Sequence, residues 1–171
     1  NENLYKPSEW RNTLSFRGCE NIFVSGLILE SSGGDGIYIG ATSKMRGCRN
    51  IVIEHVIASD HHRQGISIIS VDGLKIRHCK FRNTSGTPPM AGIDFEPNKP
   101  DEWIMNCEIS DCEFENNAVG VLLYLNLLTS RTKPVSMTFR NCKLAGNRIN
   151  LMLSAAGTTP VKGSIVFENC R

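Results

Sequence analysis

The sequence predicts an all-β solenoid in which short parallel strands stack from one coil to the next. Three observations predict it: a repeat of nearly constant length, apolar residues that alternate in short bursts, and no stretch with the apolar spacing of a helix. A repeat this short cannot bury its apolar face alone, so neighbouring repeats must stack. We therefore expect a parallel β-helix of about five to six coils of roughly 28 residues each.

The repeat is marked by a residue that precedes an apolar pair. Five such positions are separated by 29, 27, 28 and 30 residues: Gly36, Gly65, Gly92, Gly120 and Asn150. A second landmark has the same period, because the segment Gly-Cys-Glu-Asn-Ile at 18–22 returns as Gly-Cys-Arg-Asn-Ile at 47–51. A β-sandwich built from hairpins would not keep one period in two independent landmarks.

Each coil is expected to contain three strands of about three to five residues, separated by turns rich in Ser, Asn and Gly. In one coil the apolar bursts are at residues 22–24, 27–29 and 37–39, and in the next they are at 51–53, 56–58 and 66–68. Side chains alternate along a strand, so the first and third residues of each burst should face the interior and the middle residue should face outward.

The bulk composition fits a single domain over residues 1–171. The net charge is +2 and charged residues make up 21% of the chain, so no strong field indicates nucleic acid or a membrane surface as a partner. Strand-like residues begin at about Leu14 and continue to Cys170 without an amphipathic capping helix at either end. We expect the domain to be a segment of a longer solenoid, and the sequence leaves its oligomeric state open.

Seven cysteines raise the question of disulfides or a metal site. Their number is odd, and four of them follow the repeat, each directly beside a strand-like burst: Cys79, Cys112, Cys142 and Cys170. Small residues stacked in the core explain this spacing better than disulfides or a bound metal.

With this repeat, the chain resembles the pectate-lyase-like superfamily of right-handed parallel β-helices over essentially its whole length. That superfamily includes polysaccharide lyases, polygalacturonase-type glycoside hydrolases, alginate epimerases and phage tailspikes. Residues 34–37 (Gly-Asp-Gly-Ile) are similar to the Asp-Gly strand entry of the hydrolases, and residues 63–68 (Arg-Gln-Gly-Ile-Ser-Ile) resemble their Gly-His-Gly-Ile-Ser-Ile strand. The chain lacks the adjacent Asp-Asp pair and the Arg-Ile-Lys motif. The resemblance implies a divergent carbohydrate-active protein that is secreted, periplasmic or on the cell surface.

In a solenoid, function is expected on one outward strip built from consecutive coils. Counting from each repeat glycine places Tyr38, Ser67, Asp94 and Leu122 in one outward column, and Glu96 and Tyr124 in the column beside it. Asp94 and Glu96 should therefore share a face, roughly 7 Å apart by the rise of a strand. This separation suits inverting glycoside hydrolysis, which needs carboxyl groups roughly 6.5–9.5 Å apart.

These residues predict a glycoside hydrolase that cleaves a polysaccharide. One carboxyl of the Asp94 and Glu96 pair is expected to act as the general acid, with its pKa raised by its neighbour. Asp60 or Asp35 is expected to activate water as the base. The expected substrate-binding residues carry hydrogen-bonding, charged or aromatic groups, and they are His61, His62, Arg63, Tyr38, Trp103 and Tyr124.

Each of these candidates also has a structural explanation. Asp35 can shape the Gly-Gly-Asp-Gly turn, residues 60–63 can form a solvated loop, and Trp103 can cover the interior. Adjacent histidines face opposite ways on a strand, so at most one of His61 and His62 should reach a cleft.

Two other functional classes stay open at this point. A polysaccharide lyase would need a base and a cation to neutralise a uronate, and Asp35, Asp94 and Glu96 could hold Ca²⁺ for that purpose. An epimerase would favour His61 or His62 as its base. A tailspike or adhesin segment would bind glycans on the same strip without cleaving them. The hydrolase hypothesis requires neither a metal nor a cofactor.

Overall fold

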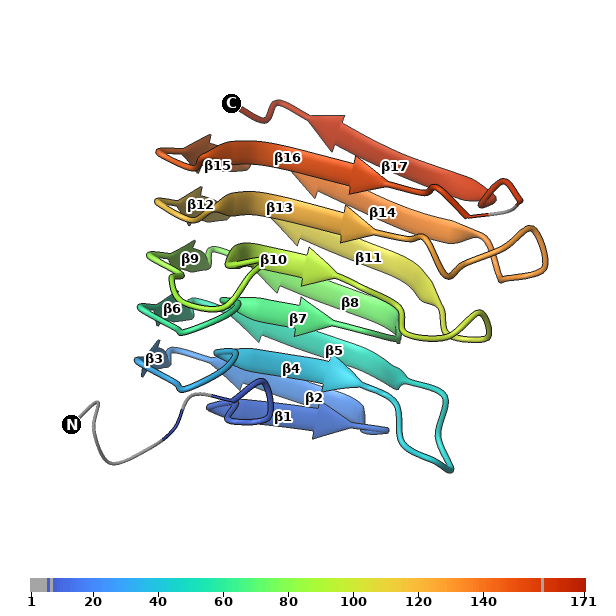
Figure 1. The fold of residues 1–171 in the computed structure, drawn as a ribbon, viewed down its shortest axis with the longest axis horizontal. Coiled ribbons are helices and arrows are strands. Elements are labelled where there is room, and N and C mark those ends of the chain that lie inside the picture. Colours follow the sequence, from blue (N-terminus) through green and yellow to red (C-terminus); the bar gives the residue numbers. More distant parts are fainter. Residues whose placement is uncertain (1–5, 7, 158) are drawn as a thin grey trace.

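Three parallel sheets are wound by one chain, with each strand paired to its equivalent in the next coil (Figure 1). The structure is a computed structural model that describes residue 6, residues 8–157 and residues 159–171. Sheet A contains β1 (Leu14–Arg17), β4 (Ile37–Gly40), β7 (Ile66–Ile68), β10 (Ala91–Phe95), β13 (Val119–Tyr124) and β16 (Ile149–Ser154). Sheet B contains β2 (Glu20–Ser25), β5 (Cys48–Glu54), β8 (Val71–Arg77), β11 (Ile104–Ser110), β14 (Val135–Arg140) and β17 (Gly163–Glu168). Sheet C contains β3 (Ile28–Glu30), β6 (Ile57–Ser59), β9 (Lys80–Arg82), β12 (Glu113–Glu115) and β15 (Lys143–Ala145).

The observed architecture confirms the predicted fold class. The described residues contain strands and no helix, and the chain makes about five turns of about 29 residues each. Ile66 of β7 pairs with Ile37 below it and with Ile93 above it, as the repeat glycines predict. The stacking of equivalent residues follows directly from the constant period of the sequence.

Alternation along the strands separates the interior from the surface. Ile37 and Ile39 are fully buried, whereas Tyr38 between them is only half-buried and faces outward. In sheet C the central residue faces inward, and its rings stack from coil to coil, with the Phe81 and Phe114 centroids 5.6 Å apart. Burial of this continuous apolar interior is the main stabilising term of the fold.

The cysteines follow the interior rather than forming bridges, and all seven are free thiols. The Cys112 Sγ donates to the Ile76 carbonyl and the Cys142 Sγ donates to the Ile109 carbonyl, each in the preceding coil. Burial raises the pKa of the Cys142 thiol to about 11, so the thiol stays neutral at physiological pH. These side chains form a column of small core groups.

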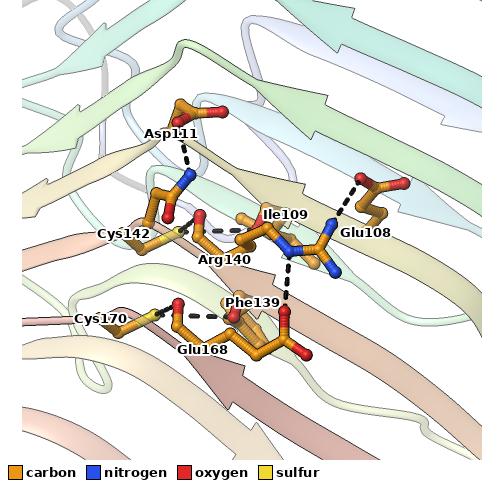
Figure 2. A network of polar contacts seen from close by, with 9 residues as sticks. Glu108, Ile109, Asp111, Phe139, Arg140, Cys142, Glu168 and Cys170 are labelled. Atoms are coloured by element: carbon orange, nitrogen blue, oxygen red, sulfur yellow. Dashed lines mark hydrogen bonds and ion pairs between the residues drawn. The ribbon is translucent and has the colours of Figure 1, made fainter.

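The outer face of sheet B is held by exposed ion pairs that join neighbouring coils. Figure 2 shows the Arg140 guanidinium between Glu108 of β11, at 3.7 Å, and Glu168 of β17, at 2.8 Å. Such exposed ion pairs contribute little to the stability of the folded state, so this network is not what holds the scaffold together.

A polar ladder inside the turn from sheet C to sheet A ties successive coils together. Asn117 Oδ1 accepts the backbone N–H of Thr84, and Asn147 Oδ1 accepts that of Asn117. His61 occupies the same position two coils earlier, where its Nδ1 accepts the backbone N–H of Ser32 at 3.1 Å. We call His61, Asn117 and Asn147 the turn ladder.

The turn ladder explains the repeat glycines. A Cβ on Gly36 would lie 2.4 Å from His61 Nε2, and a Cβ on Gly92 would lie 2.8 Å from Asn117 Nδ2. Both distances are far inside van der Waals contact, so only glycine leaves room for the ladder side chain. A Cβ on Gly65 would lie 2.5 Å from the Gly92 carbonyl oxygen instead. These glycines therefore belong to the scaffold, and the fifth coil carries Asn150 in their place.

Candidate functional site

The outer face of sheet A changes character along the solenoid axis. Strand pairing aligns Tyr38, Ser67, Asp94 and Leu122 in one column, which is the alignment that the sequence predicted. On the neighbouring column Asp35 and Gln64 precede their repeat glycines, whereas Ala91 and Val119 take the equivalent places above them. The face is therefore polar over β4, β7 and β10 and apolar over β13 and β16.

Four ionisable side chains meet on the polar half, and we call Asp35, Arg63, Asp94 and Glu96 the carboxylate–arginine cluster. The Arg63 guanidinium lies between two carboxyl groups, with Nη1 3.6 Å from Asp35 Oδ1 and Nη2 3.7 Å from Glu96 Oε2. Asp94 interacts electrostatically with all three other members. The turn at 60–65 thus brings Arg63 between carboxylates of the two neighbouring coils, with Asp35 from the coil before it and Asp94 and Glu96 from the coil after it.

Asp94 is fully buried, and Gln64 holds its carboxyl in position. Gln64 Nε2 donates to Asp94 Oδ2 at 2.8 Å, and Gln64 Oε1 accepts the backbone N–H of Ala91 at the same distance. The second bond orients the amide, so its N–H₂ group must point at the carboxyl. Sequence reasoning missed Gln64, although its place before Gly65, equivalent to Asp35 before Gly36, marks it as a member of the same face.

Burial controls the protonation of the two inner carboxyl groups. It raises the pKa of Asp35 to about 6, against the opposing effect of Arg63. Burial also raises the pKa of Asp94 well above its ordinary value, and the like charge of Glu96 adds to that shift. Both effects favour the protonated form of Asp94, next to a neighbouring carboxyl that can share its proton.

Several polar atoms of the cluster have no hydrogen-bond partner. The buried atoms without a partner are both carboxyl oxygens of Asp35, the Oδ1 of Asp94 and the Nε of Arg63. In native proteins the great majority of buried polar atoms have a hydrogen-bond partner. A group of buried polar atoms without partners on one face therefore needs an explanation beyond folding. Perturbed carboxyl groups beside an under-used arginine are typical of a binding or catalytic site.

The structure places the histidines and Asp60 outside this cluster. His61 is fully buried in the turn ladder, where burial lowers its pKa to about 4 and keeps the imidazole neutral. His62 is half-buried and its Nε2 lies 3.1 Å from Thr87 Oγ1, so it supports the loop of residues 83–90. Asp60 is an exposed turn residue with a left-handed backbone, a conformation that Asn83 and Asn116 adopt at the equivalent turns. These positions are explained by the scaffold.

Two of the three aromatic candidates lie beside the carboxylate–arginine cluster, and the third lies on another surface. Tyr38 shares the column of Asp94, and the Arg17 guanidinium lies 4.7 Å from the centre of its ring. Tyr124 is 36% exposed and follows the β10–β13 pairing one coil above Glu96. Trp103 is buried in the loop that leads to sheet B, and its ring packs under Lys133 instead of facing the cluster. Tyr38 and Tyr124 therefore border the carboxylate–arginine cluster, and Trp103 belongs to another surface.

Comparison with known families identifies the class of protein. The family model for the right-handed beta helix region matches residues 6–171, so the chain belongs to that family. This agrees with the resemblance to pectate-lyase-like β-helices, and the fold is found in carbohydrate-active proteins. No curated protein matches the chain, and no solved structure matches it either.

Two further findings concern metals and membranes. In the described part of the chain, no group of three or more His, Cys, Asp or Glu side chains is arranged to hold a metal ion. No helix among the described residues is long and apolar enough to span a bilayer.

Proposed function

We propose that the chain hydrolyses a polysaccharide that contains acidic sugars, on the polar half of the outer face of sheet A. The observation that carries this proposal is the carboxylate–arginine cluster, whose buried carboxyl groups and arginine have unused hydrogen-bonding capacity. The same face is apolar over β13, one coil above β10, so the fold itself does not demand these groups. A uronate carboxylate matches the bidentate donor geometry of an arginine.

Glu96 is the general acid in this proposal. Its side chain is 31% exposed, whereas Asp35 and Asp94 are at most 1% exposed, so Glu96 is the carboxyl that a sugar can contact directly. Glu96 protonates the glycosidic oxygen as the bond to the anomeric carbon breaks. Asp94 acts as a positioning residue beneath it, because its raised pKa keeps a proton available to the pair.

Asp35 is the base that activates water. Its carboxyl contacts Arg63 Nη1 and Glu96 contacts Nη2, so the guanidinium lies between the two carboxyl groups. In an inverting glycosidase the two carboxyl groups are likewise apart, which leaves room for the attacking water. Arg63 interacts with both at distances beyond a hydrogen bond, so a substrate carboxylate can draw it away and uncover Asp35. Water then bonds to the anomeric carbon, and its proton passes to Asp35.

Glycan binding without cleavage is the second candidate, and the burial of Asp35 and Asp94 favours it. A substrate that left Arg63 in place would touch only Glu96, Arg63 and the bordering tyrosines. A calcium-dependent lyase fits the cluster less well, because the Arg63 guanidinium already lies between Asp35 and Glu96 and because burial disfavours the ionised form of Asp94 that would bind a cation.

The test is incubation of the protein with a panel of acidic and neutral polysaccharides, followed by measurement of reducing ends and of ultraviolet absorbance from unsaturated uronates. Hydrolysis predicts new reducing ends without that absorbance. Reducing ends with the absorbance would identify a lyase instead. Neither signal, together with retention on an immobilised acidic polysaccharide, would leave the binding function and exclude the hydrolase.

A further inference from the structure

A second surface, separate from the carboxylate–arginine cluster, lies on the loops that connect sheet A to sheet B. The described residues of the loops at 41–47, 96–103, 125–134 and 155–162 project at one edge of the solenoid (Figure 1). Between the first two, β7 and β8 are joined by only two residues, 69–70. The longer loops therefore stand out on either side of a short connection, and we call them the edge loops.

The edge loops carry a concentrated positive charge. They contain six cations, all of them exposed: Lys44, Arg46, Lys99, Arg131, Lys133 and Lys162. Apart from Glu96 of the cluster, their acids are Asp101 and Glu102, and the carboxyl of buried Glu102 is used by the backbone N–H groups of Asn98 and Lys99. Among the described residues, only Arg46 of the six cations forms an ion pair, with Asp101 at 3.7 Å.

Three of these cations, Arg46, Arg131 and Lys133, line a groove with a volume of about 660 Å³, a size typical of ligand sites. The rest of the lining consists of the hydroxyl-bearing Thr129, Ser130, Thr132 and Thr159, the Trp103 indole, Pro100, and Asp101, whose carboxylate pairs with Arg46. The Lys133 Nζ lies 4.6 Å from the centre of the indole ring, and the indole N–H is buried without a partner. Hydroxyl groups and an aromatic ring beside positive charge are suited to a sugar that carries an acid group.

Hydrogen bonds between the edge loops hold the groove in shape. Thr132 Oγ1 donates to the Pro100 carbonyl at 2.9 Å, which joins the loop at 125–134 to the loop at 96–103. The Ser130 backbone N–H donates to Thr159 Oγ1 at 2.9 Å, which joins it to the loop at 155–162. A groove fixed by such contacts between coils loses little conformational entropy when a ligand binds.

From the charge, the lining and the fixed shape of this groove, we propose that the edge loops bind an acidic polysaccharide along the solenoid axis. The edge loops follow β4, β10, β13 and β16, so their cations are spread along the solenoid axis, where a linear polyanion can contact several of them. The site does not depend on catalysis at Glu96. It would retain the polymer even if the carboxylate–arginine cluster proved to have another role.

The test measures binding of oligogalacturonate, a uronic-acid oligomer, by titration calorimetry and by Trp103 fluorescence in a Trp10→Phe background. The double variant Arg131→Gln/Lys133→Gln should bind about tenfold more weakly, the equivalent of two exposed ion pairs. The matched control Arg49→Gln/Lys80→Gln, which loses the same charge on sheets B and C, should bind like the parent protein. Affinity should also fall with added salt.

Three results would overturn the proposal. One is equal binding by the double variant and the control, and another is equal affinity for a neutral galacto-oligosaccharide. The third is tighter binding of a single-stranded oligonucleotide of the same charge, which would make the edge loops a nucleic-acid surface. Because Glu96, Asp94 and Asp35 are intact in every variant, loss of binding here can be distinguished from failure of the proposed hydrolase.

Discussion

The outer face of sheet A has two halves that share one backbone register and differ in their side chains. Over β13 and β16 the outward positions carry Val119, Leu122 and Met152. Over β4, β7 and β10 the equivalent positions carry Asp35, Gln64 and Asp94. Ala91, Val119 and Leu122 form a small apolar cluster of their own, so the fold can cover this face without ionisable groups.

Stability alone does not explain the ionisable side chains of the polar half. Burying a carboxyl group costs free energy unless it is fully paired, and an apolar residue would avoid that cost. Asp35 and Asp94 are buried with unpartnered oxygen atoms only on the polar half. Four predictions test whether the two halves differ in function as they do in chemistry.

The largest expected effect is on activity, in Glu96→Gln. Glutamine keeps the size of the side chain but cannot donate the proton, so the rate of cleavage should fall by about 10²–10⁴-fold, the usual contribution of a general acid. Initial rates on the best polysaccharide of the panel measure this effect. Glu108→Gln on sheet B serves as the control and should keep full activity. A Glu96→Gln variant as active as the control would remove Glu96 from the mechanism.

Arg63→Met should destabilise the protein, because it leaves Asp35 and Glu96 without their shared cation. We expect a loss of about 2 kcal/mol near pH 8, less than the 3–5 kcal/mol of a fully buried pair because the ion pairs are long. The loss should be smaller near pH 5, since Asp35, with a pKa of about 6, is then protonated. Urea unfolding at the two pH values measures it. An equal loss at both would contradict the charge-based explanation.

Asp94→Asn should stabilise the protein at high pH while it lowers activity. A carboxyl whose pKa is raised by folding favours the folded state at low pH, and this advantage is lost as pH rises from the unfolded value towards the folded one. Asparagine can still accept the Gln64 hydrogen bond and carries no charge. We expect a gain of about 1 kcal/mol near pH 8 and little change near pH 4. Thermal unfolding across this range would contradict the account if the variant were less stable at high pH.

His61→Asn should have the smallest effect, because asparagine is the residue of the turn ladder in later coils. Activity should be unchanged, and a modest loss of stability, below about 2 kcal/mol, should come from the smaller side chain. The variant should also tolerate acid better. The unfolded imidazole takes up a proton below about pH 6.5, which the buried imidazole, with a pKa of about 4, resists. Loss of cleavage in a folded His61→Asn variant would return His61 to the substrate-binding set.

The coil period made part of this site predictable from sequence. In a parallel solenoid one interval places every strand residue, so counting from Gly65 and Gly92 was enough to align Ser67 with Asp94. The outward direction of Asp94 followed from alternation. Its complete burial did not, because the covering side chains Arg63 and Gln64 come from a turn whose path no periodicity describes.

The histidines show where sequence reasoning fell short. Two histidines beside an arginine suggested a binding loop, yet the role of His61 depends on a hydrogen bond to Ser32 in another coil. Thr84 occupies the ladder position between His61 and Asn117, which hides the relation in the sequence. The basic edge loops were visible only once the three-dimensional structure brought four separate segments to one edge.

The central claim is that substrate contacts the polar half of the outer face of sheet A. The most direct measurement is the change in backbone amide chemical shifts when an oligosaccharide from the best substrate is titrated into the Glu96→Gln variant. We expect the largest changes at Arg63, Gln64 and along β10. Changes confined to sheet B or sheet C, with Arg63 and β10 unaffected, would contradict it.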